Sequence, residues 1–156
     1  MQLKFLWIGA TKDTRFAAAE TRYLSRIRHS MPCELVTIRE ARKTDPRAHS
    51  AGLSREVEAI RQRLKKDTFL VALDELGKEM TSVQFSDFFN DLMVGPKQEV
   101  AFVCGGHLGL SEQLLGECDF RLSLSRLTLP HDLARVVLLE QVYRALSILK
   151  GLPYHR

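Results

Sequence analysis

One stretch of the chain reads Gln98-Glu-Val-Ala-Phe-Val-Cys104 and runs directly into Gly105-Gly-His-Leu-Gly109. It places three glycines in five residues after an apolar strand, and glycine lets a ligand approach the main chain closely. A second expected strand, residues 120–124, leads into Ser125-Arg-Leu-Thr-Leu-Pro130. Ligands of open α/β sheets bind beyond the carboxyl ends of the strands. We therefore predict a ligand site where these two strands end, with their loops side by side.

Strand and helix patterns alternate through the rest of the chain. Further strands are expected over residues 3–8, 34–38 and 68–73, the last followed by an exit loop, Asp74–Lys78. Helices are expected to start at Asp13 or Thr14, at Ser54 and at Ser82, and to cover residues 111–118 and about 132–150. Residues 39–52 have little to bury and predict an exposed loop. This order predicts one α/β domain, residues 1–156, with a mostly parallel sheet flanked by helices.

Composition limits the class of protein. The chain has 156 residues, 45% hydrophobic and 27% charged, which is typical of one globular domain and excludes a disordered chain. It contains neither a run of about 18 apolar residues nor a signal-peptide pattern, so we expect no membrane segment and a cytoplasmic protein. The three cysteines form no C-x-x-C pair, which favours reduced thiols and no metal site.

Charge is unevenly distributed along the chain. Residues 1–66 hold 15 Lys or Arg against 7 Asp or Glu, whereas residues 67–156 hold 8 against 12. A basic half beside a mildly acidic half suggests a face for a polyanion and a separate site for a small ligand. The alternative is that the basic residues only decorate solvated helices.

The last expected helix is apolar nearly all round, from Leu133 to Leu149. Such a helix is covered on more than one side, and in a chain of this size the second cover is expected to be another subunit. Glu140 and Arg144 are spaced i,i+4 and are expected to pair. We therefore predict a homodimer built on this helix.

The loop motifs alone are unspecific. The segment Gly105–Gly109 is not G-x-G-x-x-G, has no acidic residue about 20 positions later, and is not a P-loop. A tight structural turn therefore stays open as an alternative. The segment 124–130 alternates Leu with Ser or Thr and would suit an adenine ring read by main-chain groups. Its alternative is an ordinary loop in which His131 caps the next helix.

Several motifs taken together resemble the RlmH family of small SPOUT-class methyltransferases, over the whole chain. They are Val103-Cys-Gly-Gly-x-x-Gly109, Leu124-Ser-x-Leu-Thr-Leu-Pro-His131, Arg135, Tyr143-Arg-Ala145 and Pro153-Tyr-His-Arg156. Gly9, Lys12, Tyr23, Leu73-Asp74 and Gly77-Lys78 agree with it. Members of this family methylate a pseudouridine of bacterial large-subunit (23S) ribosomal RNA.

The resemblance implies a C-terminal trefoil knot, a homodimer and S-adenosylmethionine as cofactor. Carried over by position, the cofactor site is Leu73, Gly105, Leu124, Ser125, Arg126, Leu127, Thr128 and Leu129, with Gly106 and Gly109 shaping the same loop.

The implied substrate sets the chemistry, because N3 of pseudouridine must lose a proton before or during methyl transfer. We expect the partner subunit's C-terminal tail to complete the pocket, with His155 as base, Arg156 holding phosphate or the developing oxyanion and Tyr154 packing or orienting. Arg135 and Arg144 are structural or RNA-facing alternatives. Positioning without a dedicated base stays open.

RNA contacts are expected from the basic N-terminal half, through phosphate groups. The candidates are Lys12, Arg15, Arg22, Arg39, Arg42, Lys43 and Arg47. A chain this small is expected to recognise an assembled particle, the large subunit or the 70S ribosome. The competing hypotheses are a SPOUT enzyme acting on transfer RNA, a non-enzymatic ribosome-associated RNA-binding factor, and a nicotinamide-binding domain.

Overall fold

The structure is a computed structural model that describes residues 1–41 and 46–155, with the backbone only at residues 46–49 and 155. Its elements follow the alternation expected from the sequence. In chain order they are β1 (Gln2–Ile8), α1 (Thr14–Arg28), β2 (Cys33–Ile38), α2 (Pro46–Arg61), β3 (Thr68–Glu79), α3 (Ser82–Val94), β4 (Glu99–Cys104), α4 (Glu112–Glu117), β5 (Phe120–Ser123), α5 (His131–Leu149) and a 3-10 turn, η1 (Pro153–His155).

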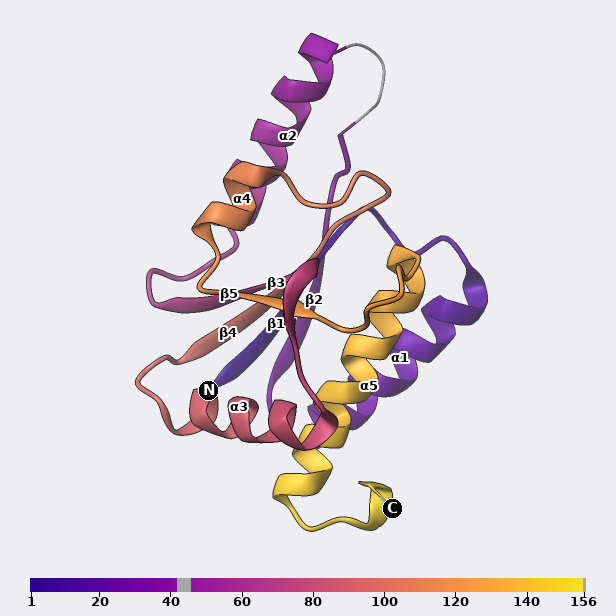
Figure 1. The fold of residues 1–156 in the computed structure, drawn as a ribbon, viewed down its shortest axis with the longest axis vertical. Coiled ribbons are helices and arrows are strands. Elements are labelled where there is room, and N and C mark those ends of the chain that lie inside the picture. Colours follow the sequence, from indigo (N-terminus) through magenta and orange to yellow (C-terminus); the bar gives the residue numbers. More distant parts are fainter. Residues whose placement is uncertain (42–45, 156) are drawn as a thin grey trace.

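The five strands form one sheet in the order β2-β1-β4-β3-β5, and every pairing is parallel. Helices α1, α3 and α5 cover one face and α2 and α4 the other (Figure 1). The central strand β4 is buried along its whole length because helices cover both of its faces. The prediction of an α/β fold with a parallel sheet is confirmed, and within the described residues no strand is antiparallel to its neighbours.

Two apolar clusters fill the layers. The larger joins aromatic residues of the sheet, such as Phe5, Trp7 and Phe102, to α1, α3 and α5. The smaller joins the other face of the sheet to Val57 and Ile60 of α2 and to α4. Helix α5 therefore rests on its own sheet, between α1 and α3 (Figure 1).

Strand β3 and helix α2 differ from the expected elements. Strand β3 does not end at Leu73 but continues to Glu79, with a register shift in which Leu122 of β5 faces both Leu73 and Lys78. The segment expected as an exit loop is thus a bulge inside a strand. Helix α2 begins at Pro46 rather than Ser54, because proline fits the first turn of a helix. Residues 42–45 of the loop expected there lie outside the described residues.

Helix starts follow capping chemistry. Asp13 caps α1 by accepting a hydrogen bond from the amide of Arg15, as expected. Helix α3 is capped by Thr81, one residue before the expected Ser82, because Thr81 and Gln84 form a reciprocal capping box. Ser111 caps α4. Helix α5 follows Pro130 without a side-chain cap, so His131 is its first residue and does not cap it.

Candidate functional site

A pocket of about 670 Å³ opens at the carboxyl ends of β3, β4 and β5. Its walls come from three segments, namely the bulge of β3, the loop after β4 and the loop after β5. Nine of the ten residues expected to bind the cofactor line it: Leu73, Gly105, Gly106, Gly109, Leu124, Ser125, Leu127, Thr128 and Leu129. The two loops face the same space although β3 separates their strands in the sheet.

The glycine loop is folded tightly on itself. A Cβ on Gly105 would lie 2.5 Å from the carbonyl carbon of Gly109, so a side chain there would force the loop apart. Gly109 has a φ of +72°, a conformation that glycine adopts at little cost. The amide of Gly109 donates to the carbonyl of Gly106 at 3.1 Å and closes the turn. The tight turn that the sequence left open as an alternative is therefore present, and it forms part of the pocket wall.

The bulge of β3 forms the opposite wall. Asp74, Glu75 and Leu76 line the pocket, and Asp74 accepts a hydrogen bond from Arg121 Nε at 2.6 Å. Gly77 is needed here because a Cβ would lie 2.7 Å from the backbone of Arg121. Because of the register shift, Asp74, Glu75 and Leu76 leave the pairing with β5 and line the pocket, whereas Lys78 and Glu79 pair with β5 again.

The loop after β5 is held by short polar contacts. Ser125 Oγ accepts from the amide of Leu127 at 2.9 Å, which leaves the Leu127 side chain 77% exposed at the pocket. Thr128 Oγ1 donates to Glu75 at 3.4 Å and joins this loop to the bulge. Arg126 is the expected cofactor residue that does not line the pocket, because its exposed side chain pairs with Glu79 instead, 3.4 Å away.

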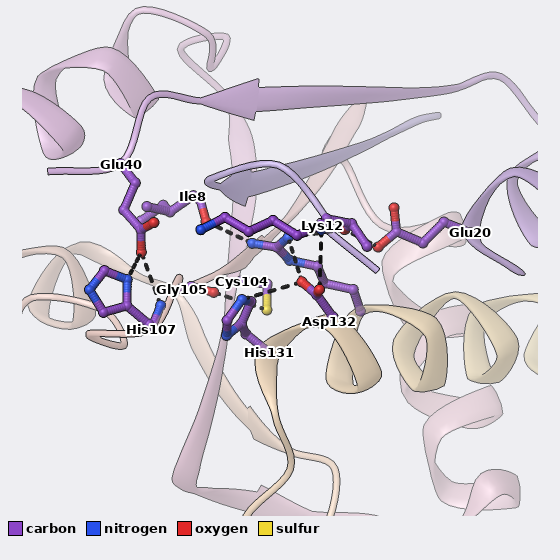
Figure 2. A network of polar contacts seen from close by, with 11 residues as sticks. Ile8, Lys12, Glu20, Glu40, Cys104, Gly105, His107, His131 and Asp132 are labelled. Carbon is purple, nitrogen blue, oxygen red and sulfur yellow. Dashed lines mark hydrogen bonds and ion pairs between the residues drawn. The ribbon is translucent and has the colours of Figure 1, made fainter. Parts of the chain in front are cut away.

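A buried arginine fixes the floor behind the pocket. Arg135 of α5 is fully buried, and its guanidinium donates to the carbonyl of Ile8 at 2.6 Å and to Thr11 Oγ1 at 3.1 Å. It also pairs with Asp132, whose other oxygen accepts from the Lys12 amide at 3.2 Å (Figure 2). These contacts tie the start of α5 to the end of β1, which favours the structural alternative for Arg135.

Two neighbours of this network have shifted pKa values. Burial raises the pKa of Cys104, which lines the pocket, to about 11, so the group is a neutral thiol at cellular pH. Burial likewise raises the pKa of Glu20, whose carboxylate accepts from Thr11 at 2.6 Å. Cys104 therefore contributes an uncharged wall and not a thiolate nucleophile.

Tyr154, in the C-terminal tail, does not line this pocket. Tyr154 OH donates to Glu140 at 3.1 Å and lies 3.4 Å from the hydroxyl of Tyr23, while Glu140 also pairs with Arg144, as expected. Burial, followed by the contact with Tyr23, raises the pKa of Tyr154 well above its ordinary value. Of the other expected catalytic residues, His155 is described by its backbone alone and Arg156 lies outside the described residues.

The expected RNA-binding residues are described in part. Lys12, Arg15, Arg22 and Arg39 are exposed; the side chain of Arg47 is not described, and Arg42 and Lys43 lie outside the described residues. Lys12 and Arg39 follow the carboxyl ends of β1 and β2, at the same edge of the sheet as the pocket. Arg15 is partly neutralised by an ion pair with Asp13, 2.7 Å away.

Comparison with known proteins agrees with this geometry. A family model described as "Predicted SPOUT methyltransferase" matches residues 1–155. This chain belongs to the SPOUT methyltransferase family. Proteins named "Ribosomal RNA large subunit methyltransferase H" are similar to it end to end: one from Geobacter metallireducens is 39% identical, covering 99% of both chains, and one from Clostridium botulinum (strain Kyoto / Type A2) is 38% identical, covering 100% of both. The resemblance stated from sequence motifs is confirmed.

Some residues at or beside the pocket were not among the site residues expected from the sequence. His131 lines the pocket, although the sequence offered it only as a possible cap of the next helix, and His107 of the glycine loop lines it as well. Glu40 contacts the glycine loop from the segment after β2 and has no sequence signal, because 67 residues separate it from His107. Among the described residues there is no cluster that could hold a metal ion, and none of the described helices could cross a membrane.

Proposed function

We propose that this chain transfers a methyl group from S-adenosylmethionine to N3 of a pseudouridine in large-subunit ribosomal RNA, as a cytoplasmic homodimer. The observation that carries this proposal is the pocket, because the glycine loop and the loop after β5, whose strands are separated by β3 in the sheet, line one space. Membership of the SPOUT family and the names of the relatives support the reaction class and the RNA substrate.

The residues present fit such a cofactor. The pocket has the size typical of small-molecule sites. Leu122, Leu124 and Leu129 offer apolar contacts for an adenine ring, and the glycine loop offers main-chain groups without side chains in the way. When bound, S-adenosylmethionine supplies an electrophilic methyl group. The protein's part is then to hold the RNA base in line with that group and to exclude water.

The proton on N3 needs an acceptor or an anion-stabilising group. His155 is the proposed base, since an unperturbed imidazole is largely neutral at cellular pH. Arg156 would hold a phosphate or the developing oxyanion, and Tyr154 would orient the tail. Tyr154 already has a fixed place, because Glu140, Arg144 and Tyr23 hold it against α1 and α5.

The position of the tail supports a composite site between two subunits. Tyr154 contacts Glu140, nine residues after His131, and nine residues of helix span about 14 Å. Tyr154 does not line the pocket of its own chain, which supports a tail that acts in catalysis on the pocket of a partner subunit. Part of α5 is available for such a contact, since Leu133, Val136 and Tyr143 are only partly buried.

The knot belongs to the same proposal. The connection from β4 to β5 passes over β3 with α4, and the chain then returns from the edge strand to α5 on the opposite face (Figure 1). The returning loop lies against the bulge of β3 through Thr128 and Glu75. A C-terminal trefoil knot would hold the loop after β5 against the bulge of β3 through the path of the chain itself.

Labelled S-adenosylmethionine would test the function. Intact 70S ribosomes from a strain lacking this protein would be assayed beside ribosomes that also lack pseudouridine. We expect label in the large-subunit RNA only when pseudouridine is present, and poor methylation of a short naked hairpin because the basic surface reads shape rather than sequence. Label on transfer RNA instead, or no label from a protein that folds and dimerises, would contradict the proposal.

A further inference from the structure

Glu40 joins the end of β2 to the glycine loop of β4. Its Oε1 atom accepts two hydrogen bonds from His107, one from the backbone amide at 3.0 Å and one from Nδ1 at 2.5 Å. Figure 2 shows the carboxylate above the loop with both contacts directed to the same oxygen. We call this pair of residues the Glu40–His107 clasp.

The clasp touches the loop at its tightest point. A Cβ on Gly106 would lie 1.9 Å from Glu40 Oε1 and 3.0 Å from the carbonyl of Ile8, so any side chain there would displace the carboxylate. The Glu40 side chain is 21% exposed, and hydrogen bonds to a partly desolvated carboxylate are stronger than neutral ones. The carboxylate and β1 thus confine the loop from two sides.

The other end of the clasp is anchored in the fold. Ile38 of β2 pairs with Ile8 of β1, two residues before Glu40. The amide of Ala41 donates to Glu56 of α2 at 2.5 Å, and Gly52 of α2 packs so closely on Ala41 that a Cβ would lie 2.6 Å from the Ala41 side chain. The backbone on both sides of Glu40 is therefore fixed by neighbouring elements, and the carboxylate is a rigid support.

We propose that Glu40 is a positioning residue that holds the Gly105–Gly109 loop in the shape that lines the pocket, so that cofactor affinity depends on the Glu40–His107 clasp. Glu40 does not itself line the pocket, whereas His107 does. A loop with three glycines loses much conformational entropy when it is ordered. A clasp that orders the loop beforehand removes this cost from binding. The identity of the cofactor rests on the proposed function.

The effect on affinity is measured by calorimetric titration of S-adenosylmethionine into the full-length protein. Glu40→Ala is expected to weaken binding on the order of tenfold, the size of effect given by one ordered loop segment. Glu40→Gln, which keeps an acceptor oxygen without the charge, is expected to lose only a few-fold. In methylation assays KM for the cofactor rises while kcat at saturation stays close to that of the wild type.

Variants of the partner test the pairing itself. His107→Asn is expected to lose less affinity than His107→Ala, because its side-chain N–H can replace the Nδ1–H donor. His107→Ala loses that bond but keeps the backbone one, and adds little loss when Glu40 is already alanine. Glu34→Ala is the matched control, an exposed glutamate on β2, the strand that precedes Glu40. Additive losses in the Glu40/His107 double variant, or an equal loss in Glu34→Ala, would overturn the proposal.

Amide hydrogen exchange at His107 tests the clasp without any cofactor. Glu40→Ala is expected to speed exchange of this amide at least tenfold while the core strand β4 stays protected, and Glu34→Ala is expected to change neither. Unchanged exchange at His107 overturns the clasp. Faster exchange with unchanged affinity overturns the positioning role. A wild-type protein that does not bind S-adenosylmethionine would contradict the proposed function, and the exchange result would still decide whether Glu40 holds the loop.

Discussion

The two ends of α5 are held in different ways. At its start, Arg135 is tied to β1 and to the loop after it by buried or partly buried contacts, and Asp132 is tied to the same loop by an exposed contact with the Lys12 amide. Toward its end, Glu140 and Arg144 hold Tyr154, whose hydroxyl also lies beside that of Tyr23 on α1. One end therefore lies at the pocket, which His131 and Ala134 line, and the other holds Tyr154, which does not line it.

The largest effect is expected from mixed dimers, which test whether the tail of one chain acts on the pocket of its partner. A chain truncated after Lys150 and a chain with Gly105→Val are each expected to be inactive, because one lacks the tail and the other lacks a usable pocket. Co-expressed at equal levels, they are expected to recover about one quarter of the wild-type sites, since only an intact pocket facing an intact tail is active. Methyl transfer to ribosomes measures this, and no recovery despite dimer formation would place the tail in its own chain.

The second largest effect is expected at the pocket end of the helix. Arg135→Met leaves the Ile8 carbonyl and Asp132 without their buried partner and is expected to lower the free energy of unfolding by about 3–5 kcal/mol. Arg22→Met, at an exposed site on α1, is expected to stay within about 0.5 kcal/mol of the wild type. Urea denaturation compares them, and equal stabilities would show that the buried network is dispensable.

A smaller effect, on cofactor affinity, is expected to distinguish a glycine of the pocket loop from a glycine elsewhere in the chain. Gly105→Ala places a Cβ 2.5 Å from the Gly109 carbonyl carbon and is expected to weaken S-adenosylmethionine binding by about tenfold or more, because small displacements of a site have large effects. Gly116→Ala in α4 meets nothing within 4 Å and is expected to leave binding unchanged. Calorimetry measures the affinity of both variants, and equal affinities would show that the glycine loop is not part of the cofactor site.

The smallest effect concerns pH. Burial raises the pKa of Glu20 above its ordinary value of 4.5, so the native state holds this proton more tightly than the unfolded chain does. The free energy of unfolding therefore falls as pH rises from 4.5 through the raised pKa. Glu20→Gln is expected to flatten this dependence by less than about 1 kcal/mol. Denaturation of the wild type and of Glu20→Gln across this range measures the difference, and an equal pH dependence of the two would contradict the role given to Glu20.

The sequence by itself determined the alternation of elements and most of the pocket. Apolar runs ended at glycine or proline, and parallel strands place their carboxyl ends at one edge, so the two loops could be assigned to one site before their contacts were known. The C-terminal motifs also identified the family, since their residue types and spacing are specific over the whole chain.

Only the tertiary structure decided how the walls of the pocket are held. The continuation of β3 past Leu73 depends on pairing with β5, and Gly77 marks a close approach that local sequence does not reveal. Glu40 and Asp132 act on residues 67 and 120 positions away, at distances along the chain that carry no periodic signal. Periodicity reports which side of an element is buried, whereas a contact between two loops exists only after the sheet has brought them together.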